Sequence, residues 1–174
     1  MSASIIRTAT PSRSITPRDA WQAILLAGAI GLSGVIVTGV LRHAASHGVA
    51  GLAIHDVWLA IHLLTVIPAV PLGAIILLRP KGTTLHRRLG RTWGMLMIAG
   101  AVSSFALHGH NGGFSWIHLL AILVLITVTR GIVQAVRGRI AQHMRTMTLV
   151  YAGLLIAGGF ALTPDRLIGA WIAG

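Results

Sequence analysis

Histidine is the side chain in this sequence whose number and placement are best suited to chemistry. The chain of 174 residues has nine histidines, no cysteine and three carboxylates. Neutral imidazole is a common ligand of metal ions and of haem iron. The lack of cysteine excludes thiolate zinc sites, iron–sulfur clusters and the covalent attachment of c-type haem. The histidines therefore predict a site built on imidazole ligands.

Four histidines form two pairs along the sequence. His62 and His118 lie one to two turns inside the second and fourth apolar segments, whereas His86 and His143 lie where the third and fifth begin. Segments that cross a membrane in alternate directions place the two pairs at opposite faces. This is the layout of a cytochrome with two b-type haems, each bound by imidazoles from two helices. An interhelical hydrogen bond for the first pair and an interfacial position for the second are the alternatives.

Five apolar segments position these histidines. The sequence is 55% hydrophobic and only 10% charged, and a helix needs about 20 apolar residues to cross a bilayer. We predict helices at about 20–42, 56–78, 84–108, 114–136 and 143–163. A short interfacial helix follows at 166–173. The fold class is thus an all-α integral membrane protein, in which a five-helix bundle (20–174) follows a tail (1–19).

The positive charge lies mostly between the apolar segments. The net charge is +11, and its concentration in the tail and in alternate loops argues against nucleic acid as a partner. The positive-inside rule then puts the N-terminus in the cytoplasm and the C-terminus outside. We interpret the Arg- and Ser-containing tail as cytoplasmic, with a mitochondrial transit peptide as the alternative.

Arginines surround the inner pair of histidines. The residues expected to hold haem propionates, or an anionic or quinone headgroup, are Arg87, Arg88, Arg91 and Arg145. Gly90 lies four residues after His86, on nearly the same helix face, and Gly94 follows one turn later. We expect this small-residue face to leave room for a porphyrin.

The remaining histidines predict a different site at the outer face. His43 and His47 share a face if the first helix extends that far, and His108 and His110 follow the third helix. These four could bind Zn²⁺, Cu²⁺ or Ni²⁺, with His55 nearby. Ordinary polar loop histidines are the alternative.

Small and aromatic residues indicate packing and anchoring. We expect close helix approaches at Gly28, Gly31, Gly34, Gly153, Gly158 and Gly159. We interpret four tryptophans near the expected helix ends as an interfacial aromatic belt: Trp58, Trp93, Trp116 and Trp171.

Two segments resemble a known family. Thr84-Leu85-His86-Arg87-Arg88-Leu89-Gly90-Arg91 and Gln142-His143-Met144-Arg145-Thr146-Met147 are similar to motifs of bacterial predicted membrane proteins, the domain of unknown function family 2306. The resemblance covers about Leu59 to Leu167 and implies a membrane location.

The four-histidine layout is also similar to that of the cytochrome b561 family. In that family the second and fourth helices bind one haem, and the third and fifth bind the other. The resemblance implies that His62 pairs with His118 and His86 with His143, and that electrons cross the membrane to or from ascorbate or quinone. The loops here are shorter, and no motif for an electron donor is present.

The sequence thus predicts a b-type cytochrome-like electron-transfer protein of the bacterial inner membrane with one or two haems. The expected partners are the lipid bilayer, a quinone or other small redox molecule, and further copies or subunits of a membrane complex. Whether the chain is itself an oxidoreductase stays open. The alternatives are a protein that binds or transports divalent metal at the outer histidines, and a non-catalytic subunit.

Overall fold

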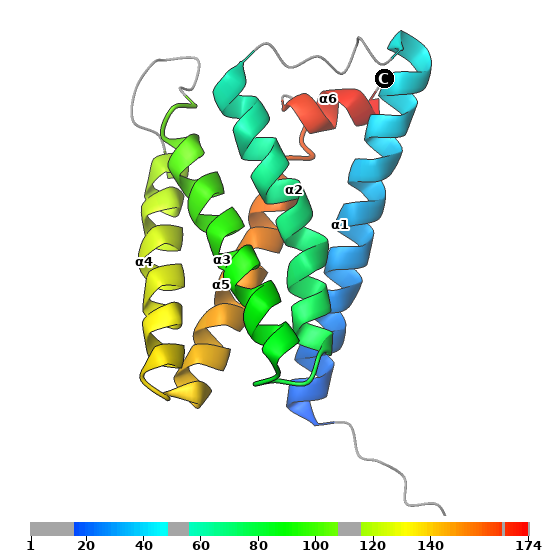
Figure 1. Ribbon diagram of the computed structural model, residues 1–174. Helices are drawn as coiled ribbons and strands as arrows, with labels where there is room; N and C mark the ends of the chain where they lie inside the picture. Colours follow the sequence, from blue (N-terminus) through cyan, green and yellow to red (C-terminus); the bar gives the residue numbers. More distant parts are fainter. Residues whose placement is uncertain (1–15, 49–55, 108–115, 165, 174) are drawn as a thin grey trace, which may run out of the picture.

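The computed structural model describes residues 16–48, 56–107, 116–164 and 166–173, which fold into helices without any strand within these ranges (Figure 1). The helices are α1 (Pro17–His47), α2 (Val57–Leu78), α3 (Thr84–Ser104), α4 (Trp116–Val136), α5 (Ile140–Phe160) and the short α6 (Leu167–Ala173). The prediction of an all-α protein is confirmed. The first helix is longer than expected, so that His43 and His47 are helical.

Side chains that cap the first turn set where three of these helices begin. The Thr16 hydroxyl accepts from the backbone N–H of Asp19, whose carboxylate accepts in return from the Thr16 N–H, and α1 starts there. Asp56 Oδ1 accepts from two N–H groups in the first turn of α2, and Thr83 Oγ1 accepts from one in α3. These caps satisfy donors that have no partner within the helix.

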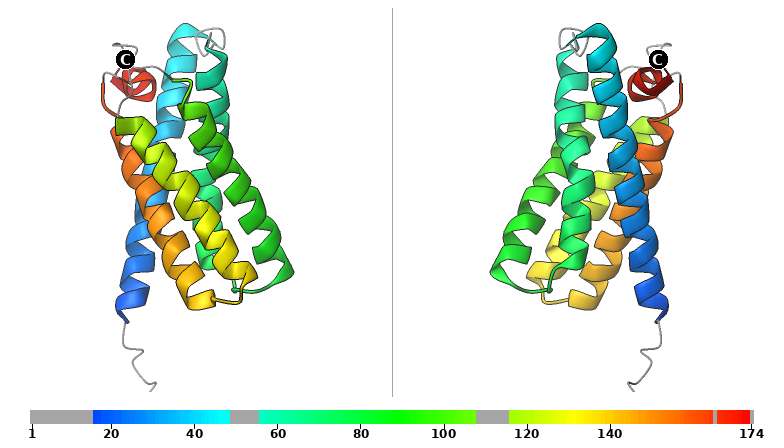
Figure 2. Two further views of the ribbon diagram at one scale, coloured as in Figure 1. Left: turned by 90° about the vertical axis from the view of Figure 1, so that its left-hand side faces the viewer. Right: turned by 90° about the vertical axis from the view of Figure 1, so that its right-hand side faces the viewer.

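Four helices form a closed ring in the order α2, α3, α4, α5. Each contacts its two neighbours, whereas the described residues of α2 and α4, and of α3 and α5, make no backbone approach across the ring. We call these two sets, α2/α4 and α3/α5, the diagonals. The weakest edge lies between α2 and α5, and α1 packs over it (Figures 1 and 2). The ring is therefore a four-helix bundle whose diagonal helices run in the same direction.

The two ends of the ring differ in charge. At the end where α1, α3 and α5 begin, which we call the basic end, the described chain carries Arg79, Lys81, Arg87, Arg88, Arg91, Arg137, Arg139 and Arg145. At the opposite end, the far end, it carries Arg42 and Arg166. The short α6 lies across the far end against α1 (Figure 2).

Large apolar side chains cover the outside of the bundle. Leu64, Ile30 and Leu119 are 74%, 73% and 68% exposed, and many other Leu, Ile and Val side chains are similar. Within the described part of the chain, three helices are long and apolar enough to cross a membrane: Asp19–His47, Val57–Leu78 and His118–Val136. Such a surface suits lipid contact, because soluble proteins rarely expose large contiguous apolar patches.

The glycines expected at helix contacts fall into two groups. A Cβ on Gly158 would lie 2.6 Å from Leu32 Cδ2, and one on Gly28 would lie 3.4 Å from Leu155 Cδ1, so these two do mark close approaches between α1 and α5. The expectation is wrong for the other four, where a Cβ would meet nothing within 4 Å: Gly31, Gly34, Gly153 and Gly159. The open glycines lie on helix faces that no other part of the described chain covers.

Candidate functional site

The four ring histidines lie on the two diagonals, one pair at each end. His62 and His118 lie near the N-terminal ends of α2 and α4, at the far end of the ring. His86 and His143 lie in the first turns of α3 and α5, at the basic end. Because the helices of a diagonal run in the same direction, the partners within each pair lie at similar depth. The ring thus has one pair of imidazoles at each end.

At the far end, His62 donates a hydrogen bond to the neighbouring helix. Its Nδ1 lies 2.9 Å from the carbonyl oxygen of Gly100 on α3, with Ser103 Oγ at 3.3 Å. A carbonyl oxygen only accepts, so Nδ1 carries the proton and the Nε2 of the neutral ring keeps its lone pair. His118, on α4, is 3% exposed, and its ring centroid lies 5.8 Å from that of Phe105.

At the basic end, His143 is held in the same way. Its Nδ1 lies 2.8 Å from the carbonyl oxygen of Gly131 on α4, which again leaves Nε2 with the lone pair. His86 lies within electrostatic range of Lys81 and, more weakly, of His143. Its Nδ1 is buried and has no hydrogen-bond partner among the described residues. One imidazole is thus fixed by the fold, and the other has an unused nitrogen.

A polar pair on α4 and α5 supports the basic-end site. Thr146 Oγ1 donates to Gln134 Oε1 at 2.9 Å, and Gln134 is 7% exposed. Thr146 lies three residues after His143, so this hydrogen bond joins α5 to α4 one turn from the His143–Gly131 hydrogen bond. Neither residue is predicted from the sequence, because a single Gln and Thr in apolar helices carry no recognisable spacing.

The predicted cofactor-binding arginines differ in what they contact. Arg87 Nη1 donates to the carbonyl of Gly82 at 3.2 Å, so its guanidinium is folded back on the 79–83 loop. Arg88, Arg91 and Arg145 are exposed at the basic end. Helical geometry turns Arg88 about 200° from His86, towards the outside of the ring. By the same geometry Arg145 is turned about 200° from His143 and Arg91 about 140° from His86, so none of the three lies on the histidine face, and Arg91 is the nearest to it.

The glycines beside His86 are not equivalent. A Cβ on Gly90 would meet nothing within 4 Å, whereas one on Gly94 would lie 3.5 Å from Ile132 Cδ1. There is thus open space at Gly90, one turn from His86. At Gly94, one turn further, Ile132 of α4 occupies the corresponding space.

Two aromatic side chains fill the middle of the ring, between the histidine pairs. Trp93 and Tyr151 lie on the α3/α5 diagonal, with ring centroids 6.4 Å apart, and are 5% and 2% exposed. Trp93 Nε1 donates to the carbonyl of Ala69 at 2.9 Å, and the Tyr151 hydroxyl donates to that of Val70 at 2.8 Å.

The interpretation of Trp93 as an interfacial anchor is wrong, because its side chain is buried in the ring. Its position seven residues after His86, on the same helix face, was the signal for a core residue.

The outer histidines are described only in part. His43 and His47 share a face of α1, as expected, and their rings stack at 4.4 Å. His55, His108 and His110 lie outside the described residues. Within those residues, no group of three or more His, Cys, Asp or Glu side chains is placed to hold a metal ion.

The chain matches one family model, described as "Predicted membrane protein (DUF2306)", over residues 59–167. The matched region runs from α2 to the first residue of α6, so it contains the whole ring and its four histidines, whereas α1 lies outside it. No curated protein and no solved structure matches the chain.

Proposed function

The chain belongs to the DUF2306 family of predicted membrane proteins, and from that premise we propose that it is a b-type cytochrome-like electron carrier of the bacterial inner membrane. The observation that carries the proposal is the placement of two imidazole pairs on the two diagonals, one at each end of the ring. Low-spin haem b takes its axial ligands from two helices in this manner.

The proposal includes five membrane spans with the basic end in the cytoplasm. Helices α3 and α5 each have 21 residues, as α4 does, and such a helix is about 31 Å long, close to the hydrocarbon thickness of about 30 Å. Their first two turns carry Arg87, Arg91 and Arg145, whose long side chains can extend to the headgroups. The positive-inside rule then orients the protein. A phosphatase that folds only outside the cytoplasm, fused after Gly174, should be active.

The hydrogen bonds of His62 and His143 support ligation through Nε2. Histidines that bind a metal generally donate their other N–H to a carbonyl or carboxylate, which fixes the ring orientation and the tautomer. Both rings donate Nδ1–H to a carbonyl of the adjacent helix. The buried Nδ1 of His86 has no partner among the described residues, and an unpaired polar atom in this position is costly unless a further group binds nearby.

The residues at the basic end also suit a haem's charged edge. A bound haem b would supply reversible one-electron chemistry. The chain would supply the imidazole ligands, the space beside Gly90, and the basic-end arginines, whose long side chains would fold back over the helix ends to reach the propionates. The same cations suit an anionic or quinone redox partner in the cytoplasmic leaflet.

The aromatic pair would separate the two ligand sites. Trp93 and Tyr151 are almost fully buried, and each has its polar atom paired to the backbone of α2. They leave no unpaired polar group in the middle of the ring to attract water. Electrons could therefore pass between the ends while water and ions are excluded.

Visible spectra of the protein, expressed with a haem supply and purified in mild detergent, test the proposal. We expect a Soret band and split α/β bands on reduction, which are typical of bis-imidazole haem. His143→Ala should lower the haem-to-protein ratio by removing the basic-end ligand, and His47→Ala, outside the ring, should leave it unchanged. A featureless spectrum from folded wild-type protein would refute the proposal.

A divalent-metal site is the second candidate. The stacking of His43 and His47 on one face of α1 favours it, because imidazoles at this spacing can share a metal ion. Titration with Zn²⁺, Cu²⁺ or Ni²⁺ should then give binding that is lost in the double variant His43→Ala/His47→Ala and kept in His143→Ala.

A further inference from the structure

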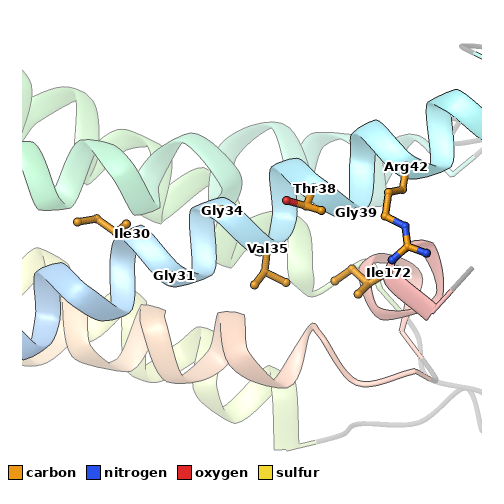
Figure 3. A pocket seen from close by; sticks show the side chains of 8 residues that line it. All are labelled: Ile30, Gly31, Gly34, Val35, Thr38, Gly39, Arg42 and Ile172. Atoms are coloured by element: carbon orange, nitrogen blue, oxygen red, sulfur yellow. The ribbon is translucent and has the colours of Figure 1, made fainter.

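A groove runs along α1 on a face that the ring does not use. It has a volume of about 370 Å³, and α6 closes it at the far end (Figure 3). Its lining is Ile30, Gly31, Gly34, Val35, Thr38, Gly39, Arg42 and Ile172. The side chains by which α1 packs onto the ring are different ones, namely Leu25, Ala29 and Leu32. The groove is therefore an outward surface of α1.

Glycine residues, which have no side chain, create the groove. A Cβ on Gly31 or Gly34 would meet nothing within 4 Å, so both positions are open. Ile30 and Val35 stand beside them, and Ile172 of α6 covers Gly39, where a Cβ would lie 2.6 Å from Ile172 Cγ1. The result is an apolar groove that α6 closes at one end.

The length of the groove matches one leaflet of a bilayer. Ile30 and Arg42 are twelve positions apart along α1, which corresponds to about 18 Å of helix. Half of a hydrocarbon core of about 30 Å is about 15 Å. An acyl chain that starts at the headgroups would thus run along the groove for most of its length.

A cation lies at the far end of the groove, beside α6. Arg42 is exposed at the far end, and its side chain extends beside Ile172 of α6 (Figure 3). Arg42 lies about 35 Å along the helix from Asp19, the acidic residue at the start of α1. If Asp19 lies at the headgroups of one leaflet, Arg42 lies at the phosphates of the other.

We propose that this groove binds a phospholipid of the far-end leaflet, with one acyl chain along Gly31 and Gly34 and the phosphate at Arg42. An arginine forms strong charge-assisted hydrogen bonds with phosphate, and the apolar lining suits a chain of methylenes. The site is independent of haem and of electron transfer. It depends only on α1 crossing the bilayer.

The shape of the groove argues against a second copy of α1 as the occupant. A helix with its side chains is about 10 Å across, and it needs a long open face of small residues to approach closely. Here α6 covers Gly39, so that only Gly31 and Gly34 remain open. A flexible acyl chain that starts at Arg42 can bend past Ile172 of α6, whereas a rigid helix would collide with it.

Native mass spectrometry of delipidated protein titrated with phosphatidylglycerol tests the proposal. We expect one tightly held lipid on the wild type. Gly34→Leu, which fills the groove, should abolish this binding, and Gly153→Leu is the matched control, because Gly153 is equally open on α5. Arg42→Gln removes the phosphate contact without touching a packed side chain and should weaken binding about tenfold.

Three results would overturn the proposal. The first is a wild type that retains no lipid. The second is equal retention by the Gly34→Leu and Gly153→Leu variants. The third is a dimer in the wild type that Gly34→Leu dissociates without loss of lipid, which would make a second copy the occupant. The haem content of the same samples reports separately on the proposed electron-transfer function.

Discussion

Gly73 on α2 is the position at which a single methyl group should have the largest effect on the ring. A Cβ there would collide with the ring of Tyr151 and lie 3.0 Å from Trp93 Nε1. Both aromatic side chains are buried, and both are hydrogen-bonded to the two residues Ala69 and Val70 of the same helix. The rings cannot withdraw without losing those hydrogen bonds. We therefore expect Gly73→Ala to destabilise the protein.

The size of the effect follows from two costs. Overpacking a core by one methyl group typically costs about 1 to 3 kcal/mol, and the loss of a buried hydrogen bond costs about 0.5 to 1.5 kcal/mol. Together they predict a loss of about 1.5 to 4.5 kcal/mol. For a chain of this size, that loss corresponds to a decrease in Tm on the order of 10 °C.

The Tm is measured by heating detergent-purified protein to a series of temperatures. Size-exclusion chromatography then gives the fraction that remains folded at each temperature. Gly153→Ala is the control, because its Cβ would meet nothing within 4 Å, and its Tm should change little. In a Tyr151→Leu background the obstacle is absent, so that Gly73→Ala should cost much less than in the wild type. Equal Tm values for Gly73→Ala and Gly153→Ala would refute the reasoning.

Three further predictions concern stability and use the same assay. Thr146→Val leaves the buried Gln134 Oε1 without its donor and should cost about 1 to 3 kcal/mol; an unchanged Tm would show that the pair contributes nothing. Asp56→Ala removes the cap of α2 and should cost about 1 kcal/mol, whereas Asp56→Asn should restore most of it. Gly131→Ala should cost less than Gly73→Ala, because the side chain that its Cβ would meet is the flexible end of Met147; the reverse order would contradict this.

The sequence was sufficient to predict the helices and the depth of the histidines. Long apolar segments separated by charged loops leave few alternatives to membrane helices, and His62, His86, His118 and His143 lie near helix starts that caps or loops define. The structure adds that their helices form the diagonals of one ring. That order depends on which helix faces meet, and no local pattern encodes it.

The sequence was not sufficient to distinguish the core from the lipid-facing surface. In α2, Ala69 is fully buried and Leu64 is 74% exposed, although both are apolar. Lipid tails and protein cores accept the same side chains, so that the alternation that marks the core of a soluble protein is weak here. For this reason the sequence wrongly predicts a surface anchor at Trp93 and contacts within the chain at the open glycines Gly31 and Gly34.

The position of α1 has a consequence for biosynthesis. Its buried residues Leu25, Ala29 and Leu32 pack over the edge between α2 and α5, yet α1 emerges from the ribosome first and α5 last among the long helices. Until Ile140–Phe160 has been synthesised, the part of the docking surface of α1 that α5 supplies does not exist. Its backbone hydrogen bonds are all internal, so that it can reside alone in lipid during this interval. Docking of α1 is then the step that closes the bundle, and a chain arrested before Ile140 should expose the same three residues to membrane quality-control proteases.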